Sequence, residues 1–112
     1  RQESLTAVKE LVAMHLRRNL DDQTTRLLFA ASRGDTQTIS VICDHGFDPN
    51  NHDYDNRTAL MVASMRGNTD AARLLLRYNA CPNKIDMHGS SALLEATKNG
   101  HGDIMDLLFQ YG

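Results

Sequence analysis

The chain has 112 residues, of which 41% are hydrophobic and 23% are charged, and its formal net charge at pH 7 is −2. This length and composition fit a single soluble domain. The charge balance gives no reason to expect nucleic acid, because phosphate binding requires a concentrated basic surface. No apolar run approaches the length that crosses a bilayer, so this segment is not expected to insert directly into a membrane.

The first 19 residues predict an amphipathic helix that stands outside the pattern of the rest of the chain. Ser4 is a candidate N-cap, and a polar turn is expected at residues 17–22. Two interpretations stand for this helix: a cap that covers the exposed end of the following array, or a linker from a preceding domain. The apolar residues that recur there at helical spacing are Leu5, Val8, Leu11, Val12 and Leu16.

The remaining chain repeats with a period of 33 residues. Residues 53–60 align with residues 86–93, and the alignment continues without a gap so that Gly67 falls on Gly100. Stepping back by the same offset gives a third copy around Thr25. A fixed period of this length indicates a repeat architecture. The sequence therefore predicts three copies, at residues 20–52, 53–85 and 86–112.

The second copy shows how one unit is expected to fold. Thr58 is a suitable N-cap for a first helix, which ends at Gly67, and Asn68 is a candidate N-cap for a second helix. That second helix carries Leu75 toward the core and stops at Asn79, a residue that tolerates left-handed geometry. Both helices are too short to be stable alone, so they must bury their apolar faces against neighbouring copies.

The motif Asp-x-x-Gly/Asn-x-Thr/Ser-Ala-Leu-x-x-Ala, followed by Gly and a Leu-Leu-Leu/Phe run, resembles the ankyrin repeat. The resemblance implies an all-α solenoid of about three helix-turn-helix repeats, each preceded by a β-turn. None of the three copies has the proline of the family's Thr-Pro-Leu-His, which removes a pre-organised first helical turn. A less stable array is therefore expected. Met105 and Phe109 stay apolar where a terminal cap would be polar, so the array is expected to continue beyond residue 112.

The residues give little support for catalysis, a cofactor or a metal site. Counted from Asp53, an EF-hand loop would need glycine at Thr58 and glutamate at Ser64. The five histidines lack metal-ligand spacing. There is no nucleophile elbow and no glycine-rich phosphate loop. We therefore expect no enzyme activity and no cofactor. The resemblance to the ankyrin repeat implies a structural role for His101 between two helices.

A binding role remains, and the partner is expected to be another protein, with self-association left open. The resemblance implies that partner contacts come from the variable turn positions and from the end of each first helix. Tyrosine, methionine and arginine at such positions are typical of interface cores. The candidate residues are Arg33, His52, Tyr54, Asp55, Arg57, Met65, Arg66, Met87, His88 and Lys98, with Ser32, Ile85, Ser90 and Asn99 at further positions of the same kind.

Residues 48–50, 53–60 and 93–100 are similar to the ankyrin array in the cytoplasmic tail of plant Shaker-type potassium channels. This similarity implies a regulatory interaction module in the cytoplasm, attached to a larger signalling or channel protein. The segment 53–60 is also similar to the ankyrin repeats of glutaminases and plant ankyrin-kinases, which implies as an alternative a structural appendage of an oligomeric enzyme. Cys43 and Cys81 are expected to be reduced cytosolic thiols.

Overall fold

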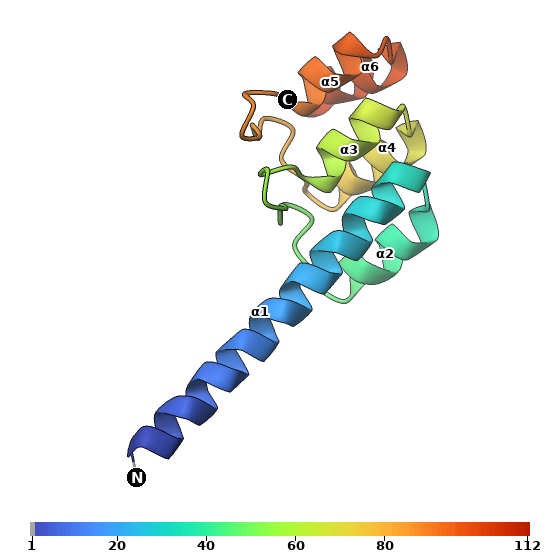
Figure 1. The fold of residues 1–112 in the computed structure, drawn as a ribbon. Coiled ribbons are helices and arrows are strands. Elements are labelled where there is room, and N and C mark those ends of the chain that lie inside the picture. Colours follow the sequence, from blue (N-terminus) through green and yellow to red (C-terminus); the bar gives the residue numbers. More distant parts are fainter. Residues whose placement is uncertain (1) are drawn as a thin grey trace.

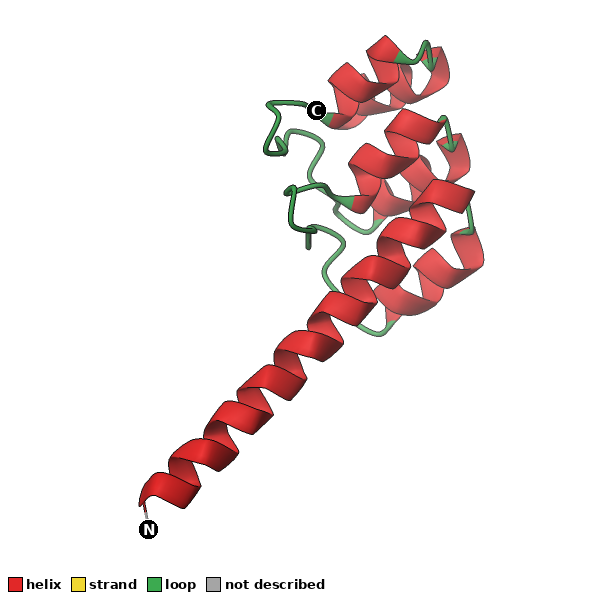
Figure 2. Ribbon diagram, in the orientation of Figure 1, coloured by secondary structure: helices red, strands yellow, loops and turns green. Residues whose placement is uncertain are grey.

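The computed structural model describes the backbone of residues 2–112 and the side chains of residues 7–10 and 22–112. In this part of the chain six helices are joined by turns and loops, with isolated bridges in place of strands (Figures 1 and 2). The predicted all-α class is confirmed. The helices are α1 (Gln2–Arg33), α2 (Thr36–Asp44), α3 (Ala59–Arg66), α4 (Thr69–Arg77), α5 (Ala92–Lys98) and α6 (Gly102–Tyr111).

The helices form two stacked rows. The C-terminal half of α1 packs beside α3, which packs beside α5, and this is the inner row (Figure 1). Helices α2, α4 and α6 form the outer row behind it. Two loops project on the side of the inner row: the first finger loop, residues 45–58, and the second finger loop, residues 78–91. A single antiparallel bridge closes the base of each loop, His52 to Thr58 and Ile85 to Ser91.

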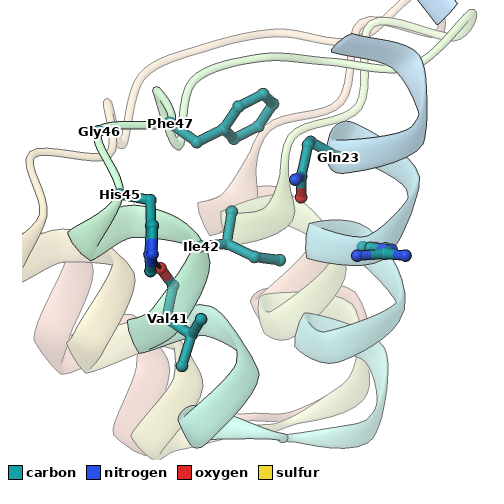
Figure 3. A pocket seen from close by; sticks show the side chains of 7 residues that line it. Gln23, Val41, Ile42, His45, Gly46 and Phe47 are labelled. Atoms are coloured by element: carbon teal, nitrogen blue, oxygen red, sulfur yellow. Dashed lines mark hydrogen bonds between the residues drawn. The ribbon is translucent and has the colours of Figure 1, made fainter. Parts of the chain in front are cut away.

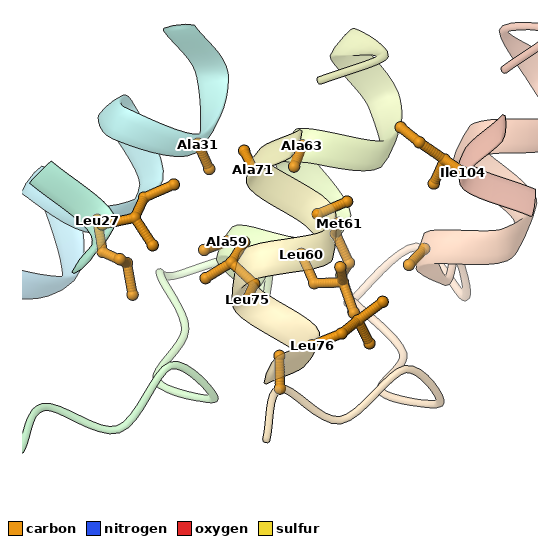
Figure 4. Packing of buried hydrophobic residues seen from close by; sticks show 14 of the residues in the cluster. Leu27, Ala31, Ala59, Leu60, Met61, Ala63, Ala71, Leu75, Leu76 and Ile104 are labelled. Atoms are coloured by element: carbon orange, nitrogen blue, oxygen red, sulfur yellow. The ribbon is translucent and has the colours of Figure 1, made fainter. Parts of the chain in front are cut away.

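The core is a continuous strip of apolar side chains between the two rows. Leu27, Leu60, Leu75 and Ile104 are fully buried, and they come from all three helix pairs (Figure 4). Buried alanines fill the spaces between the helices, where only small side chains fit a close-packed interior. The predicted burial of Leu75 is confirmed.

Most of the predicted local signals of the second copy are confirmed. Thr58 accepts a hydrogen bond from the N–H of Met61 at 3.4 Å, as an N-cap should. Gly67 and Asn79 adopt left-handed backbone geometry, with φ of 76° and 70°. The imidazole of His101 meets the carbonyl oxygen of Met65 at 3.2 Å, which supports its expected structural role between helices.

Asn68 differs from the expectation. It precedes α4, but its side chain does not cap that helix. Its amide nitrogen instead donates to the carbonyl oxygens of Ala31 and Ser32, at 2.7 and 2.9 Å. Those carbonyls lie in the last turn of α1, where helical partners are missing. Asn68 therefore ties the end of α1 to the second helix pair.

The polar turn predicted at residues 17–22 is wrong, because α1 runs as one helix from Gln2 to Arg33, with Ser4 inside it. No glycine or proline occurs before Gly34. Residues such as Asn19, Asp21 and Asp22 each disfavour a helix interior by only about 0.7 kcal/mol relative to alanine. Polar residues without a helix breaker were not enough to end the helix.

The N-terminal half of α1 projects away from the other helices (Figure 1). A helix of 32 residues is about 48 Å long at 1.5 Å per residue, so α1 accounts for most of the 60 Å long dimension of the molecule. Val8 is 56% exposed; the side chains of the other predicted apolar residues lie outside the described ones. This geometry favours the linker interpretation over the cap, and the choice stays a prediction. Within the described residues, no helix is both long and apolar enough to cross a membrane.

Leu75→Ala tests the stacked core. Leu75 is fully buried between the helix pairs, so its truncation should lower the free energy of unfolding by roughly 2–5 kcal/mol, as measured by chemical denaturation. Leu74→Ala is the matched control, because Leu74 is only partly buried beside the same core, and it should cost clearly less. A loss below about 0.5 kcal/mol for Leu75→Ala would contradict the stacking described above.

Candidate partner-binding groove

A groove lies between α1, α3 and the first finger loop. It has a volume of about 280 Å³. Phe29 stands on its α1 side with 63% of its surface exposed. We call this feature the inner groove; its lining residues are Thr25, Leu28, Phe29, Ser32, Asp53 and Val62. A second hollow of about 210 Å³ shares Thr25 and Asp53 with it and continues to Tyr54.

The first finger loop is shaped by its own aspartate. One carboxylate oxygen of Asp53 accepts hydrogen bonds from the N–H groups of Asp55 and Arg57, both at 2.9 Å. Asp53 thus holds the loop in a tight turn against the inner groove. The two loops are joined where the N–H of Met87 donates to the carbonyl oxygen of Asp55 at 2.8 Å.

The second finger loop repeats this arrangement around Asp86. One carboxylate oxygen of Asp86 accepts hydrogen bonds from the N–H groups of Ser90, at 2.9 Å, and His88, at 2.8 Å. The bond from Ser90 is the main cause of a lowered pKa of Asp86; burial opposes that shift and the bond from His88 adds to it. Asp86 is therefore held as a carboxylate that anchors the loop.

Six of the predicted site residues lie on the finger loops, and all of these except Arg57 are exposed. Tyr54 is the most open, at 94% of its surface, and Met87 is 65% exposed. The other exposed candidates on these loops are His52 and Asp55 in the first and His88 in the second. The hydrogen bond between the loops brings Asp55 and Met87 together, so these positions form a continuous rim beside the inner row.

Three basic candidates lie elsewhere, at the last positions of the inner helices. Arg33, Arg66 and Lys98 end α1, α3 and α5 respectively, and all are exposed. Basic side chains at helix C-termini also interact favourably with the helix dipole, which is a structural reason for their presence. The structure places them at the opposite end of the inner helices from the finger loops.

The remaining two candidates, Arg57 and Met65, are half-buried and lie close to each other. The Nε atom of Arg57 is 3.7 Å from a carboxylate oxygen of Asp86, whose side chain is 3% exposed. Both candidates line a small hollow of about 10 Å³ between α3 and the second finger loop, together with Met61, Val62, Asp86 and Glu95. Arg57 therefore has a partner within the chain, which weakens the case for it as a contact to another protein.

Of the residues that line the inner groove, only Ser32 was predicted as a contact position; the others, above all Phe29, were not. A signal was present, because the 33-residue offset places Phe29 on Val62 and on Glu95. Three chemically different side chains at one position of a close repeat indicate a position that the fold does not fix. The predicted contact positions lay at the turns and the helix ends, so they did not include the exposed face of the first helix.

A larger hollow, of about 440 Å³, lies at the α1–α2 end of the array (Figure 3). Its walls combine the apolar Ile42 and Phe47 with the polar Gln23 and His45. Arg26, which also lines it, occupies the position of Ala59 in the next copy, where the side chain is fully buried. A charged residue there makes this end unlike the stacking faces inside the array.

The α5–α6 end, in contrast, is apolar. Leu94 and Phe109 are 45% and 65% exposed, whereas the residues at the same positions of the second copy, Met61 and Leu76, are buried by the third. This end therefore presents the kind of surface that is covered elsewhere in the array. Within the described residues, no group of three or more His, Cys, Asp or Glu is placed to hold a metal ion.

Comparison with known proteins agrees with this geometry. A family model described as ankyrin repeats (3 copies) matches residues 1–86 and again residues 27–112. The crystal structure of the human ASB11 ankyrin repeat domain superposes with a TM-score of 0.73 and 24% identity, over 77% of this chain and 39% of that one. This chain thus spans well under half of that domain. No curated protein matches the chain. The solenoid predicted from the 33-residue period is confirmed, and the chain belongs to the ankyrin repeat family.

Proposed function

We propose that this chain is a protein-docking module that binds its partner along the inner groove and the finger loops. Ankyrin repeats are protein–protein interaction modules, and stacked repeats offer an extended surface for this purpose. The observation that carries the proposal is the exposure of large apolar side chains on one side of the molecule. Phe29, Tyr54 and Met87 each expose more than half of their surface there, and such patches are typical of interaction sites.

The proposal includes a regulatory role within a larger cytosolic or membrane-attached protein. The similarity to the cytoplasmic array of plant Shaker-type potassium channels suggests a channel as one host. A cytoplasmic location is supported by Cys43 and Cys81, which are both free thiols, as in proteins of a reducing compartment. The non-catalytic character of the repeat family supports a binding rather than an enzymatic role.

A double variant, Phe29→Ala with Tyr54→Ala, tests the docking surface. Because both side chains are largely exposed, the fold should tolerate the change, with each substitution costing within about 0.5 kcal/mol. Affinity for a cognate partner should fall about tenfold or more, since truncation of an interface aromatic residue can cost more than about 1 kcal/mol. The partner would be captured on the immobilised chain, purified, and its affinity measured by calorimetry.

Val41→Ala is the control for this experiment. Val41 is also an exposed apolar residue, at 57%, but it lies on α2 in the outer row, where it lines the hollow at the α1–α2 end and not the inner groove. The Val41→Ala variant should bind the cognate partner with unchanged affinity. If the double variant binds like the unmodified chain while its melting curve is intact, the groove is not the docking surface.

A second candidate function is a structural one, in which the chain serves assembly of an oligomeric host. The specific observation in its favour is the apolar α5–α6 end, where Leu94 and Phe109 are exposed and partly buried Leu93 and Met105 lie at the core beneath them. Surfaces of this kind are covered by the next copy inside the array. Self-association through this end would bury them in the same way.

Phe109→Glu distinguishes the structural candidate. If the α5–α6 end mediates self-association, the unmodified chain should sediment with a concentration-dependent mass above that of the 12.5 kDa monomer. The charged variant should then remain monomeric over the same range, because burial of an unpaired carboxylate is strongly unfavourable. A monomer at all concentrations for the unmodified chain would exclude self-assembly through this end, and Phe29→Ala serves as the control variant.

A further inference from the structure

The inner groove occurs twice in this molecule, and the two copies differ in what fills them. The lining residues Leu28, Phe29, Ser32, Asp53 and Val62 fall, by the 33-residue offset, on Met61, Val62, Met65, Asp86 and Glu95. These second residues all line the hollow between α3 and the second finger loop. The first copy has a volume of about 280 Å³ and the second about 10 Å³. The same site is open in one copy and closed in the other.

The closed copy is filled by the chain's own side chains. Met65 is a long flexible residue where the open copy has Ser32, and methionine fills irregular gaps well. Arg57 adds a cation, whose Nε atom lies 3.7 Å from the carboxylate of Asp86. An aliphatic chain and a guanidinium group beside an aspartate thus occupy this space in the second copy.

The open copy has the corresponding aspartate, but it lacks the methionine and the arginine that occupy the closed copy. Asp53 holds its loop as Asp86 does, through one carboxylate oxygen. Among the described residues, however, no lysine, arginine or histidine forms an ion pair with Asp53. The position that corresponds to Arg57 is Thr24, which carries no charge. Among the described residues, the open groove therefore presents an aspartate and the exposed Phe29 without a cation paired to the aspartate.

We propose that the inner groove receives an arginine flanked by an aliphatic residue from a segment of a partner protein. The guanidinium group would meet Asp53, as Arg57 meets Asp86, and the aliphatic side chain would fill the space that Met65 fills in the second copy. This inference rests on the proposed docking function and specifies the chemistry of the partner.

Two physical arguments favour arginine as the occupant. A guanidinium group pairs with a carboxylate through several N–H donors in a fixed plane, and it also stacks on aromatic faces better than an ammonium group does. Phe29 supplies an aromatic ring for such stacking, because 63% of its surface is exposed and it lines the same groove as Asp53. The apolar side chains of Leu28 and Val62 complete the site for the aliphatic neighbour.

The test uses the full chain and short synthetic peptides. The probe is the acetylated and amidated peptide Gly-Ser-Leu-Arg-Leu-Ser-Gly, and the comparison peptides carry Gln or Glu in place of Arg. Binding is followed by nuclear magnetic resonance, as shifts of backbone amide signals in the ¹⁵N-labelled chain. The arginine peptide should shift the signals of Thr25, Asp53 and Val62 saturably, with an affinity about tenfold above that of the glutamate peptide.

Two variants test whether the arginine peptide binds in the inner groove beside Asp53. Asp53→Asn keeps an acceptor oxygen for the loop but removes the charge, so the preference for arginine over glutamine should fall by about fivefold. Ser32→Met places in the open groove the residue that closes the second copy, and it should abolish the shifts. Gln37→Met adds the same side chain at an exposed position of α2 and should change nothing.

Equal binding of the arginine and glutamate peptides, or undiminished binding to Ser32→Met, would overturn the inference. These outcomes differ from a failure of the proposed docking function. If the cognate partner binds the Phe29→Ala and Tyr54→Ala double variant normally while the peptides still select arginine, the docking function fails at this surface and the chemistry of the groove stands. If the partner is lost but the peptides show no charge preference, only the present inference fails.

Discussion

The contact between neighbouring helix pairs is the interaction on which the whole structure depends. Helices α2 to α6 have between seven and ten residues, and helices of this length are not stable alone in water. Leu60 and Leu75 of the second pair pack between Leu27 of the first and Ile104 of the third, with alanines between them (Figure 4). Because every pair is stabilised by its neighbours, the inner helices must lie side by side. That order puts both finger loops on one side of the molecule and so creates the groove.

The wall of the groove is fixed by hydrogen bonds that leave the helix surface free to vary. Asp53 and Asp86 each bind two N–H groups of their own loop, and these bonds are local, so the loop keeps its shape whatever residue stands on the facing helix. Phe29 and Val62, at the same position of successive copies, can therefore differ without disturbing the fold. Within one repeat, the residues that fix the backbone of the loop are therefore different from the residue that varies on the surface of the groove.

The elements that the sequence predicted well are those in which one residue determines one backbone feature. Gly67 and Asn79 take the left-handed geometry that they tolerate best, Thr58 caps its helix, and the period places Leu75 in the core. The failures concern competition between partners that are far apart in the chain. Asn68 had a local cap available but binds the end of α1, more than 30 residues earlier. The groove likewise joins Phe29 to Asp53, a residue more than 20 positions later in the chain, so its walls are brought together only by the fold.

The long first helix and the open groove have a common origin. By the repeat register, residues 12–25 correspond to the finger loop at residues 45–58, yet the chain is helical throughout that stretch. In the second copy Arg57 stands in a loop, directly before the N-cap, and can turn toward Asp86. In the first copy the corresponding residue, Thr24, is held inside a helix and is uncharged. The first copy thus has a threonine within a continuous helix where the second copy has its loop arginine, and among the described residues no cation forms an ion pair with Asp53.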